Sequence, residues 1–236
     1  MQEVSFPGKK SSTVVNIMLK NLKLRLFKIR YQNWWLGKAP TPPYKHVVQI
    51  GDPILRSAAK PVDPSTLKRG PMIKLFNRLY YLMTVTKAAG LAAPQIGVSL
   101  RVFAIQCPDV TKFNGSPVLY ERRGMEHIPF QIWVNPKMKI LEYDRIDDEE
   151  CCESMRGFSA EIPRFKRILL SGTDQDGIEK SWEAKDWSAR IVQHEMDHLD
   201  GKFFTDSMNP KSLACVNWDA INHHRGRIYT TYMPDR

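Results

Sequence analysis

The chain has 236 residues, a length that suits one domain with an appendage and that allows a substantial core to be buried. Its formal net charge of +10 is concentrated in the first 51 residues, which carry +8, so the remaining 185 carry +2 and the nearly neutral body argues against direct DNA binding. Four cysteines are too few for a disulfide-stapled secreted domain and indicate a reducing compartment.

The amino-terminal segment is basic and periodically apolar. No Asp or Glu lies from Val4 to Gly51, and apolar residues spaced by three or four positions form the stripe of an amphipathic helix, namely Val15, Leu19, Leu22, Leu26 and Ile29. Charged residues lie between these apolar positions, so no uninterrupted apolar stretch is long enough for a transmembrane segment or a secretory signal. We predict a mitochondrial transit peptide and linker over residues 1–44, followed by a folded domain with a C-terminal tail over residues 45–236. A basic surface helix and a membrane-surface helix are the alternatives.

The body contains one long helical pattern and several short strand-like runs. Between Ser65 and Thr86, four apolar residues recur at helical spacing and predict a helix that packs on the core, namely Met72, Phe76, Leu79 and Met83. Strand-like runs follow around residues 102–105, before Pro136, at 137–143 and at 165–172, and a turn at 173–177 precedes a last run. Short strands with helices at either end indicate an α+β fold with mostly antiparallel sheet.

The last predicted helix carries the stretch QHEMDHLDG, residues 193–201. We expect it to start near Ser188, with Ser188 or Asp186 as its cap, and to stop before Gly201. His194 and His198 are four positions apart, so both side chains project from one face of the helix and could reach one metal ion.

The surroundings of these two histidines favour a metal site. Glu195 lies beside His194, close enough to address a water molecule on a bound ion without being a ligand. Ile191 and Leu199 flank the pair and would turn it toward the interior, where unpaired polar groups are costly. The alternative is a helix whose histidines lie on a solvated or hydrogen-bonded face.

A metal site of this kind needs a third protein ligand. A zincin-type peptidase would take it from downstream, but no Glu follows Glu195, and His223 and His224 lie in a tail with weak structural signals. The adjacent Cys151 and Cys152 are a better source, because a thiolate is a strong ligand and the pair follows a strand-like stretch.

Three stretches in this order resemble the motifs of the peptide deformylases: GLAAPQIG (residues 90–97), ECCES (150–154) and QHEMDHLDG (193–201). The resemblance covers roughly Lys45 to Met208, and the continuation ESMRGF with a later IPR is most similar to the animal mitochondrial branch. It implies an α+β fold with mostly antiparallel sheets around a central helix that carries the histidines. It also implies a metal-dependent hydrolase in the mitochondrial matrix that removes the N-formyl group from the initiator Met of newly made proteins and releases formate.

The resemblance also implies a metal site. Cys152, rather than Cys151, would bind one divalent ion together with His194 and His198. Members of the family favour Fe²⁺ and also bind Zn²⁺, Co²⁺ or Ni²⁺, so the ligands alone do not identify the ion.

The remaining site residues follow from the same resemblance. Glu195 would act as general acid and base, and the Gln95 side-chain amide and the Glu153 backbone N–H would donate to the formyl oxygen. Gly90, Leu91 and Gln95 would contact the formyl-Met peptide. The partners implied are nascent formyl-Met chains, with the mitochondrial ribosome as a candidate partner.

Three positions depart from the family pattern. Ala88 and Cys151 replace glycines, and Glu153 replaces a leucine, which puts a carboxylate beside an expected oxyanion donor. These changes bear on catalytic efficiency more than on metal binding. A weakly active or inactive deformylase-like protein that binds metal or partners is therefore the second hypothesis, and a zincin-like peptidase is the third.

Overall fold

The computed structural model describes residues 40–113 and 115–232. The chain divides at position 41, and the elements below belong to the unit that runs from Pro42 to Arg236. The predicted transit peptide lies outside the described residues, apart from the last positions of its linker.

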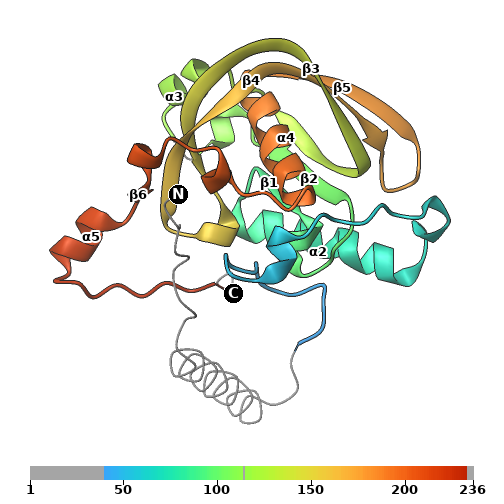
Figure 1. Cartoon of the computed structure of the whole chain (residues 1–236), viewed down its shortest axis with the longest axis horizontal. Coiled ribbons are helices and arrows are strands. Elements are labelled where there is room, and N and C mark those ends of the chain that lie inside the picture. Colours follow the sequence, from blue (N-terminus) through green and yellow to red (C-terminus); the bar gives the residue numbers. More distant parts are fainter. Residues whose placement is uncertain (1–39, 114, 233–236) are drawn as a thin grey trace, which may run out of the picture. The chain divides into compact units, whose positions relative to one another are not determined.

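One antiparallel sheet forms the framework of the domain (Figure 1). Five strands pair in chain order: β1 (Gly90–Ala92), β2 (Val102–Cys107), β3 (Ile128–Cys151), β4 (Phe158–Thr173) and β5 (Glu179–Lys185). A sixth, β6 (Ala214–Cys215), pairs with β4. The α+β class with mostly antiparallel sheet is therefore confirmed.

Strand β3 is longer than the sequence predicted. Two separate strand-like runs were expected on either side of Pro136, but β3 passes through this position without ending. The register shifts between Val134 and Lys137, and Asn135 adopts a positive φ of 49°. The residues around Pro136 therefore form a bulge and do not end the strand. The Asn135 side chain stabilises this bulge through two hydrogen bonds with the Val62 backbone, at 2.7 and 2.8 Å. Strand β4 likewise begins earlier than predicted, at Phe158.

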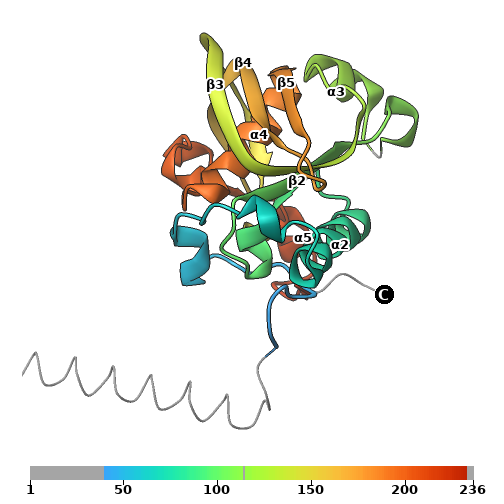
Figure 2. The same cartoon turned by 90° about the vertical axis from the view of Figure 1, so that its right-hand side faces the viewer.

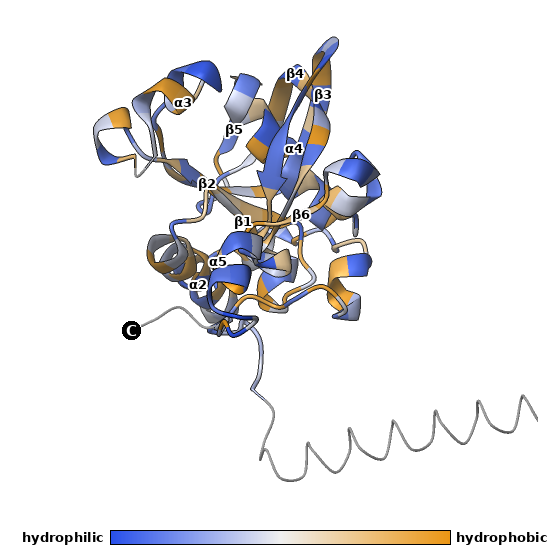
Figure 3. Cartoon of the chain, turned by 90° about the vertical axis from the view of Figure 1, so that its left-hand side faces the viewer, coloured by the Kyte–Doolittle hydropathy of each residue, from blue (hydrophilic) through white to orange (hydrophobic). Residues whose placement is uncertain are grey.

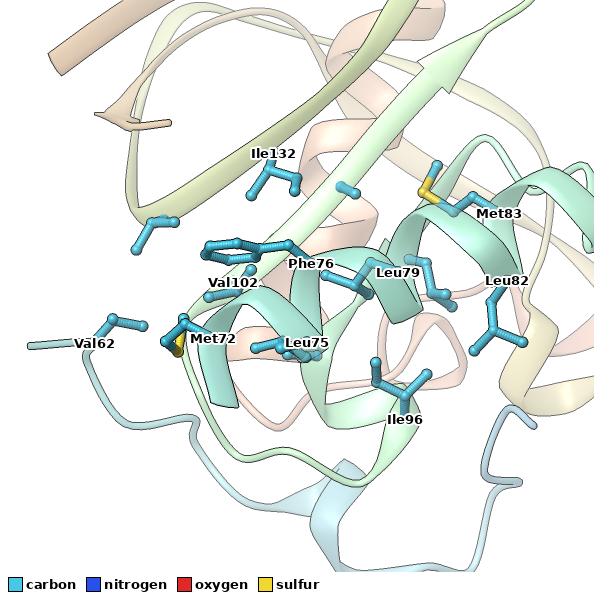
Figure 4. Packing of buried hydrophobic residues seen from close by; sticks show 14 of the residues in the cluster. Val62, Met72, Leu75, Phe76, Leu79, Leu82, Met83, Ile96, Val102 and Ile132 are labelled. Atoms are coloured by element: carbon cyan, nitrogen blue, oxygen red, sulfur yellow. The ribbon is translucent and has the colours of Figure 1, made fainter. Parts of the chain in front are cut away.

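The predicted core helix is present as α2 (Gly70–Thr86). Its four predicted core residues, Met72, Phe76, Leu79 and Met83, are all buried. Figure 4 shows them packing with Leu75 and Leu82 of the same helix and with side chains from other parts of the chain, including Val62, Ile96, Val102 and Ile132. This cluster, called the α2 cluster below, forms the part of the core between α2 and the strands β1 and β2.

The histidine-bearing helix is α4 (Asp186–Leu199). The predicted cap was wrong by one to three residues, because Lys185 is the cap and Ser188 lies at the third helical position. From there the Ser188 hydroxyl accepts from the Lys185 N–H at 3.1 Å and donates to the Lys185 carbonyl at 2.7 Å. Figures 1 and 2 show α4 alongside β4 and β5, and it also contacts β1, so the predicted central position of this helix is confirmed.

Two short helices complete the described domain, α3 (Pro117–Arg122) and α5 (Trp218–His223). In Figure 3, hydrophobic residues gather around β1 and β2, whereas hydrophobic and hydrophilic residues alternate along β3 and β4. Among the described residues, no helix is both long and apolar enough to cross a membrane.

We predict that Leu79→Ala lowers the free energy of unfolding by about 2–5 kcal/mol, because it removes a fully buried side chain from the middle of the α2 cluster. Urea unfolding of both proteins measures the difference. Val85→Ala on the same helix is the control, since that residue is 37% exposed and its change should cost less than about 1 kcal/mol. A loss below that limit for Leu79→Ala would show that the cluster is not tightly packed.

Candidate active site

Three potential metal ligands converge between the end of β3 and α4. The donor atoms of Cys152, His194 and His198 all lie within 4.8 Å of one another. The Cys152 Sγ is 3.3 Å from the His198 Nε2, and the two imidazole centroids are 5.0 Å apart. One thiolate and two imidazoles are a donor set that suits a divalent transition metal, so these residues fit the implied ion.

The two adjacent cysteines lie in different environments. Cys152 is 6% exposed, and its sulfur also accepts from the Ser154 N–H at 3.4 Å, which orients it at the start of a short 3₁₀ helix. Cys151 is exposed and is not part of the ligand cluster. The sulfur that faces the histidines is therefore that of Cys152.

Glu195 is buried next to these ligands. Its side chain is 2% exposed, and its Oε2 has no hydrogen-bond partner within the described part of the chain. Burial raises the pKa of this carboxyl to about 7, despite the opposing effect of His194. A carboxyl with this pKa can both accept and release a proton near neutral pH.

Gly90 and Leu91 of β1 occupy different positions relative to the site. A Cβ at Gly90 would clash with the Glu195 carboxylate, so the absence of a side chain there makes room for Glu195. Gly90 also lines the site cavity. The Leu91 side chain is fully buried in the α2 cluster, so a substrate contact there would have to come from its backbone.

Gln95 holds its amide group next to the ligand cysteine. Its Oε1 accepts from the Ala92 N–H at 2.8 Å, which leaves Nε2 directed toward the Ser154 Oγ at 3.2 Å and the Cys152 Sγ at 3.6 Å. The residue therefore ties a loop together and also presents an N–H donor next to the ligand cluster.

Glu153 contributes to the same wall. Its carbonyl accepts from the Gln49 Nε2 at 2.8 Å, which fixes the backbone at this position. Its half-buried side chain lines the cavity, and burial raises the pKa of the carboxyl in spite of the nearby Arg156.

A buried ion network that was not predicted from the sequence supports the site. Glu150 accepts from His194 Nδ1 at 2.9 Å, from Arg164 at 2.8 and 3.0 Å, and from Arg190 at 2.8 Å. Arg164 also pairs with Asp197 at 2.6 Å. Two signals in the sequence point to this role: Glu150 lies two positions before Cys152 and so shares its strand face, and a ligand histidine commonly donates its second ring N–H to a carboxylate.

The network keeps Glu150 ionised in the interior. Burial opposes ionisation of this carboxyl, but the hydrogen bonds from His194 and Arg164 outweigh it and hold its pKa well below the usual range. The same pairing raises the pKa of Arg164 against the effect of its own burial. An ionised Glu150 fixes the His194 ring so that its other nitrogen faces the cluster.

The site opens into a cavity of about 320 Å³. Its polar wall includes Cys152, His194 and Glu195. Its other wall is apolar, formed by Ala88, Ala89, Trp187 and Ile191. Trp187 packs on the core and also lines this cavity. The arrangement can hold an apolar side chain while a neighbouring polar group reaches Glu195 and the ligands.

We predict that Glu150→Gln lowers the affinity for Zn²⁺ by about 10- to 100-fold, because His194 loses the carboxylate that orients it. The variant should also lose about 3–5 kcal/mol of stability, since the buried Arg190 loses its ion-pair partner and Arg164 retains only Asp197. Competition with a chromogenic chelator measures the affinity, and Glu149→Gln at the exposed neighbouring position is the control. Equal Zn²⁺ affinity in the two variants would contradict the orienting role of Glu150.

Comparison with known proteins agrees with this geometry. The family model described as polypeptide deformylase matches residues 44–214. The human protein named peptide deformylase, mitochondrial, is 39% identical over 78% of this chain and 75% of its own length, and the Arabidopsis thaliana peptide deformylase 1A, chloroplastic/mitochondrial, is 32% identical over 91% and 81%. The crystal structure of peptide deformylase from Ehrlichia chaffeensis aligns with a TM-score of 0.60 at 26% identity, over 70% of this chain and 88% of that one. The chain therefore belongs to the polypeptide deformylase family.

Proposed function

We propose that this protein removes the N-formyl group from the initiator Met of newly synthesised mitochondrial proteins and releases formate. The observation that carries this proposal is the buried Glu195, with a pKa of about 7, next to the converging ligand atoms at the wall of an apolar cavity. The formyl group would reach Glu195 while the Met side chain occupies the cavity. A free amino terminus and formate are the products.

Cys152, His194 and His198 would hold one divalent ion. When bound, such an ion acts as a Lewis acid and lowers the pKa of a coordinated water from about 15.7 toward 7. Glu150 would keep His194 oriented through the hydrogen bond at 2.9 Å. The protein would present three fixed donor atoms, one from Cys152 directly after β3 and two from α4.

Glu195 would move the proton. Its carboxylate would take a proton from the water that attacks the formyl carbon, and it would later give that proton to the amine nitrogen as the carbon–nitrogen bond breaks. Proton transfer of this kind contributes about 10²- to 10⁴-fold in rate. The pKa of about 7 suits both halves of the transfer.

Gln95 and the Glu153 backbone would stabilise the oxyanion. The Gln95 Nε2 lies beside the Cys152 sulfur, and the hydrogen bond from Ala92 to its Oε1 holds this orientation. Loss of one donor to such an oxyanion costs about 10²- to 10³-fold in turnover. Gly90 and the backbone of Leu91 would pair with the bound peptide at the edge of β1.

The ion, the location and the partners extend this proposal. Fe²⁺ would be the native ion, with Zn²⁺, Co²⁺ and Ni²⁺ as substitutes, since the donor set accepts all four. The mitochondrial matrix is the proposed location, supported by the basic acid-free amino terminus and by the printed names of the relatives. A nascent-chain substrate favours action near the mitochondrial ribosome.

A weakly active or inactive protein remains the second hypothesis, because Ala88 places a methyl group at the cavity where the family pattern has glycine. The complete set of ligands, Glu195 and Gln95 argues for activity. A zincin-like peptidase is disfavoured, because the ligand atom beside the histidines comes from upstream, at Cys152.

Formate release from formyl-Met-Ala-Ser by protein loaded with Fe²⁺ or Co²⁺ tests the proposal. We expect release well above that of the metal-free protein, and we expect Glu195→Gln to keep the metal and lose about 10²- to 10⁴-fold in kcat. Metal content is measured on the same samples. No release above the metal-free control would favour the inactive protein, and cleavage of internal peptide bonds would favour the peptidase.

A further inference from the structure

The C-terminal segment supplies one residue to the cavity of the candidate active site. Val216 is among the cavity-lining residues, together with Cys151, Cys152 and Ser159. It lies beyond residue 214, where the match to the family model ends. This part of the wall therefore comes from outside the matched region.

Strand pairing places Val216 next to the start of β4. Ser159 of β4 lies opposite Cys151 of β3 on one side and opposite Ala214 of β6 on the other. Directly opposed residues share a face of the sheet, and so do residues two positions apart on one strand. Val216 continues the pairing through a hydrogen bond from its N–H to the Gly157 carbonyl at 2.9 Å. Val216, which directly follows β6, therefore lies beside Gly157 and lines the cavity together with Cys151 and Ser159.

Further contacts hold the C-terminal segment against the chain that follows the ligand cysteine. The Arg156 Nη1 donates to the Thr231 carbonyl at 2.7 Å. A Cβ at Gly157 would lie 3.5 Å from the side-chain Nδ2 of Asn217, so Gly157 and Asn217 are neighbours. Because Arg156 and Gly157 follow Cys152 by only a few residues, these contacts fix Val216 relative to the ligand site.

The exposure of Val216 places it at the mouth of the cavity. It is 52% exposed, whereas Cys152 is 6% and Glu195 is 2% exposed. With the formyl group at Glu195 and the Met side chain in the cavity, the next residue of the substrate must leave through this mouth. A branched apolar side chain there can contact that residue and limit its size.

We infer that Val216 is a specificity-determining residue for the amino acid that follows formyl-Met in the substrate. The inference rests on the proposed function and adds a second recognition position to it. Small and medium apolar side chains at the second position would pack against Val216, and bulky aromatic ones would be excluded.

Val216→Ala and Val216→Phe test this inference with two substrates, formyl-Met-Ala-Ser and formyl-Met-Trp-Ser. The measured quantity is the kcat/KM of the Ala peptide divided by that of the Trp peptide. We expect Val216→Ala to lower this ratio about three- to tenfold through KM, which is less than the roughly 10- to 200-fold effect of one methylene in an enclosed pocket. Val216→Phe should raise the ratio by a similar factor, with kcat for the Ala peptide retained.

Val118→Ala is the matched control, because Val118 is 72% exposed on α3 and does not line the cavity. The control should leave the ratio unchanged. Ratios within twofold of the unmodified protein in both Val216 variants would overturn the inference. The affinities of the products Met-Ala-Ser and Met-Trp-Ser, measured by calorimetry, give the same comparison without turnover. An absence of formate release would therefore count against the proposed function, while the role of Val216 in specificity could still be tested by binding.

Discussion

The candidate site depends on one buried carboxylate, that of Glu150. It joins Arg164 of β4 to Arg190 and His194 of α4, and it lies at the end of β3. Moving a carboxylate out of water costs several kcal/mol, and only close hydrogen-bonded partners offset that cost. Three such partners surround Glu150. These contacts hold the end of β3, β4 and α4 in fixed positions relative to one another.

The chemistry of the site follows from a contrast between two neighbouring carboxyl groups. Glu150 is surrounded by cations and stays ionised, so it can orient His194. Glu195 is buried beside Gly90 and forms no ion pair with the residues that the structure describes, and its pKa rises to about 7. One carboxyl therefore acts as a fixed charge, and the other is suited to exchange a proton.

Local features of the sequence predicted well, whereas features that depend on register did not. The spacing of His194 and His198 sets their shared helix face, and the motif order identified Cys152 as their partner. The Glu150 network joins residues 14 to 44 positions apart, so it depends on the β3–β4 register and on the placement of α4. Strand β3 was predicted as two strands because Pro136 interrupts strand pairing. The hydrogen bonds of Asn135 with Val62 stabilise a bulge at this position, so the strand continues. The approach of Val216 to the cavity likewise arises from the pairing of β6 with β4.

X-ray absorption spectroscopy of the Zn²⁺-loaded protein tests the central claim most directly, namely that Cys152, His194 and His198 form one metal site. We expect one sulfur at about 2.3 Å and two imidazole nitrogens at about 2.0–2.1 Å from the ion. The sulfur contribution should disappear in Cys152→Ser and persist in Cys151→Ser. A first shell without sulfur in the unmodified protein, or one that loses sulfur only in Cys151→Ser, would contradict the account.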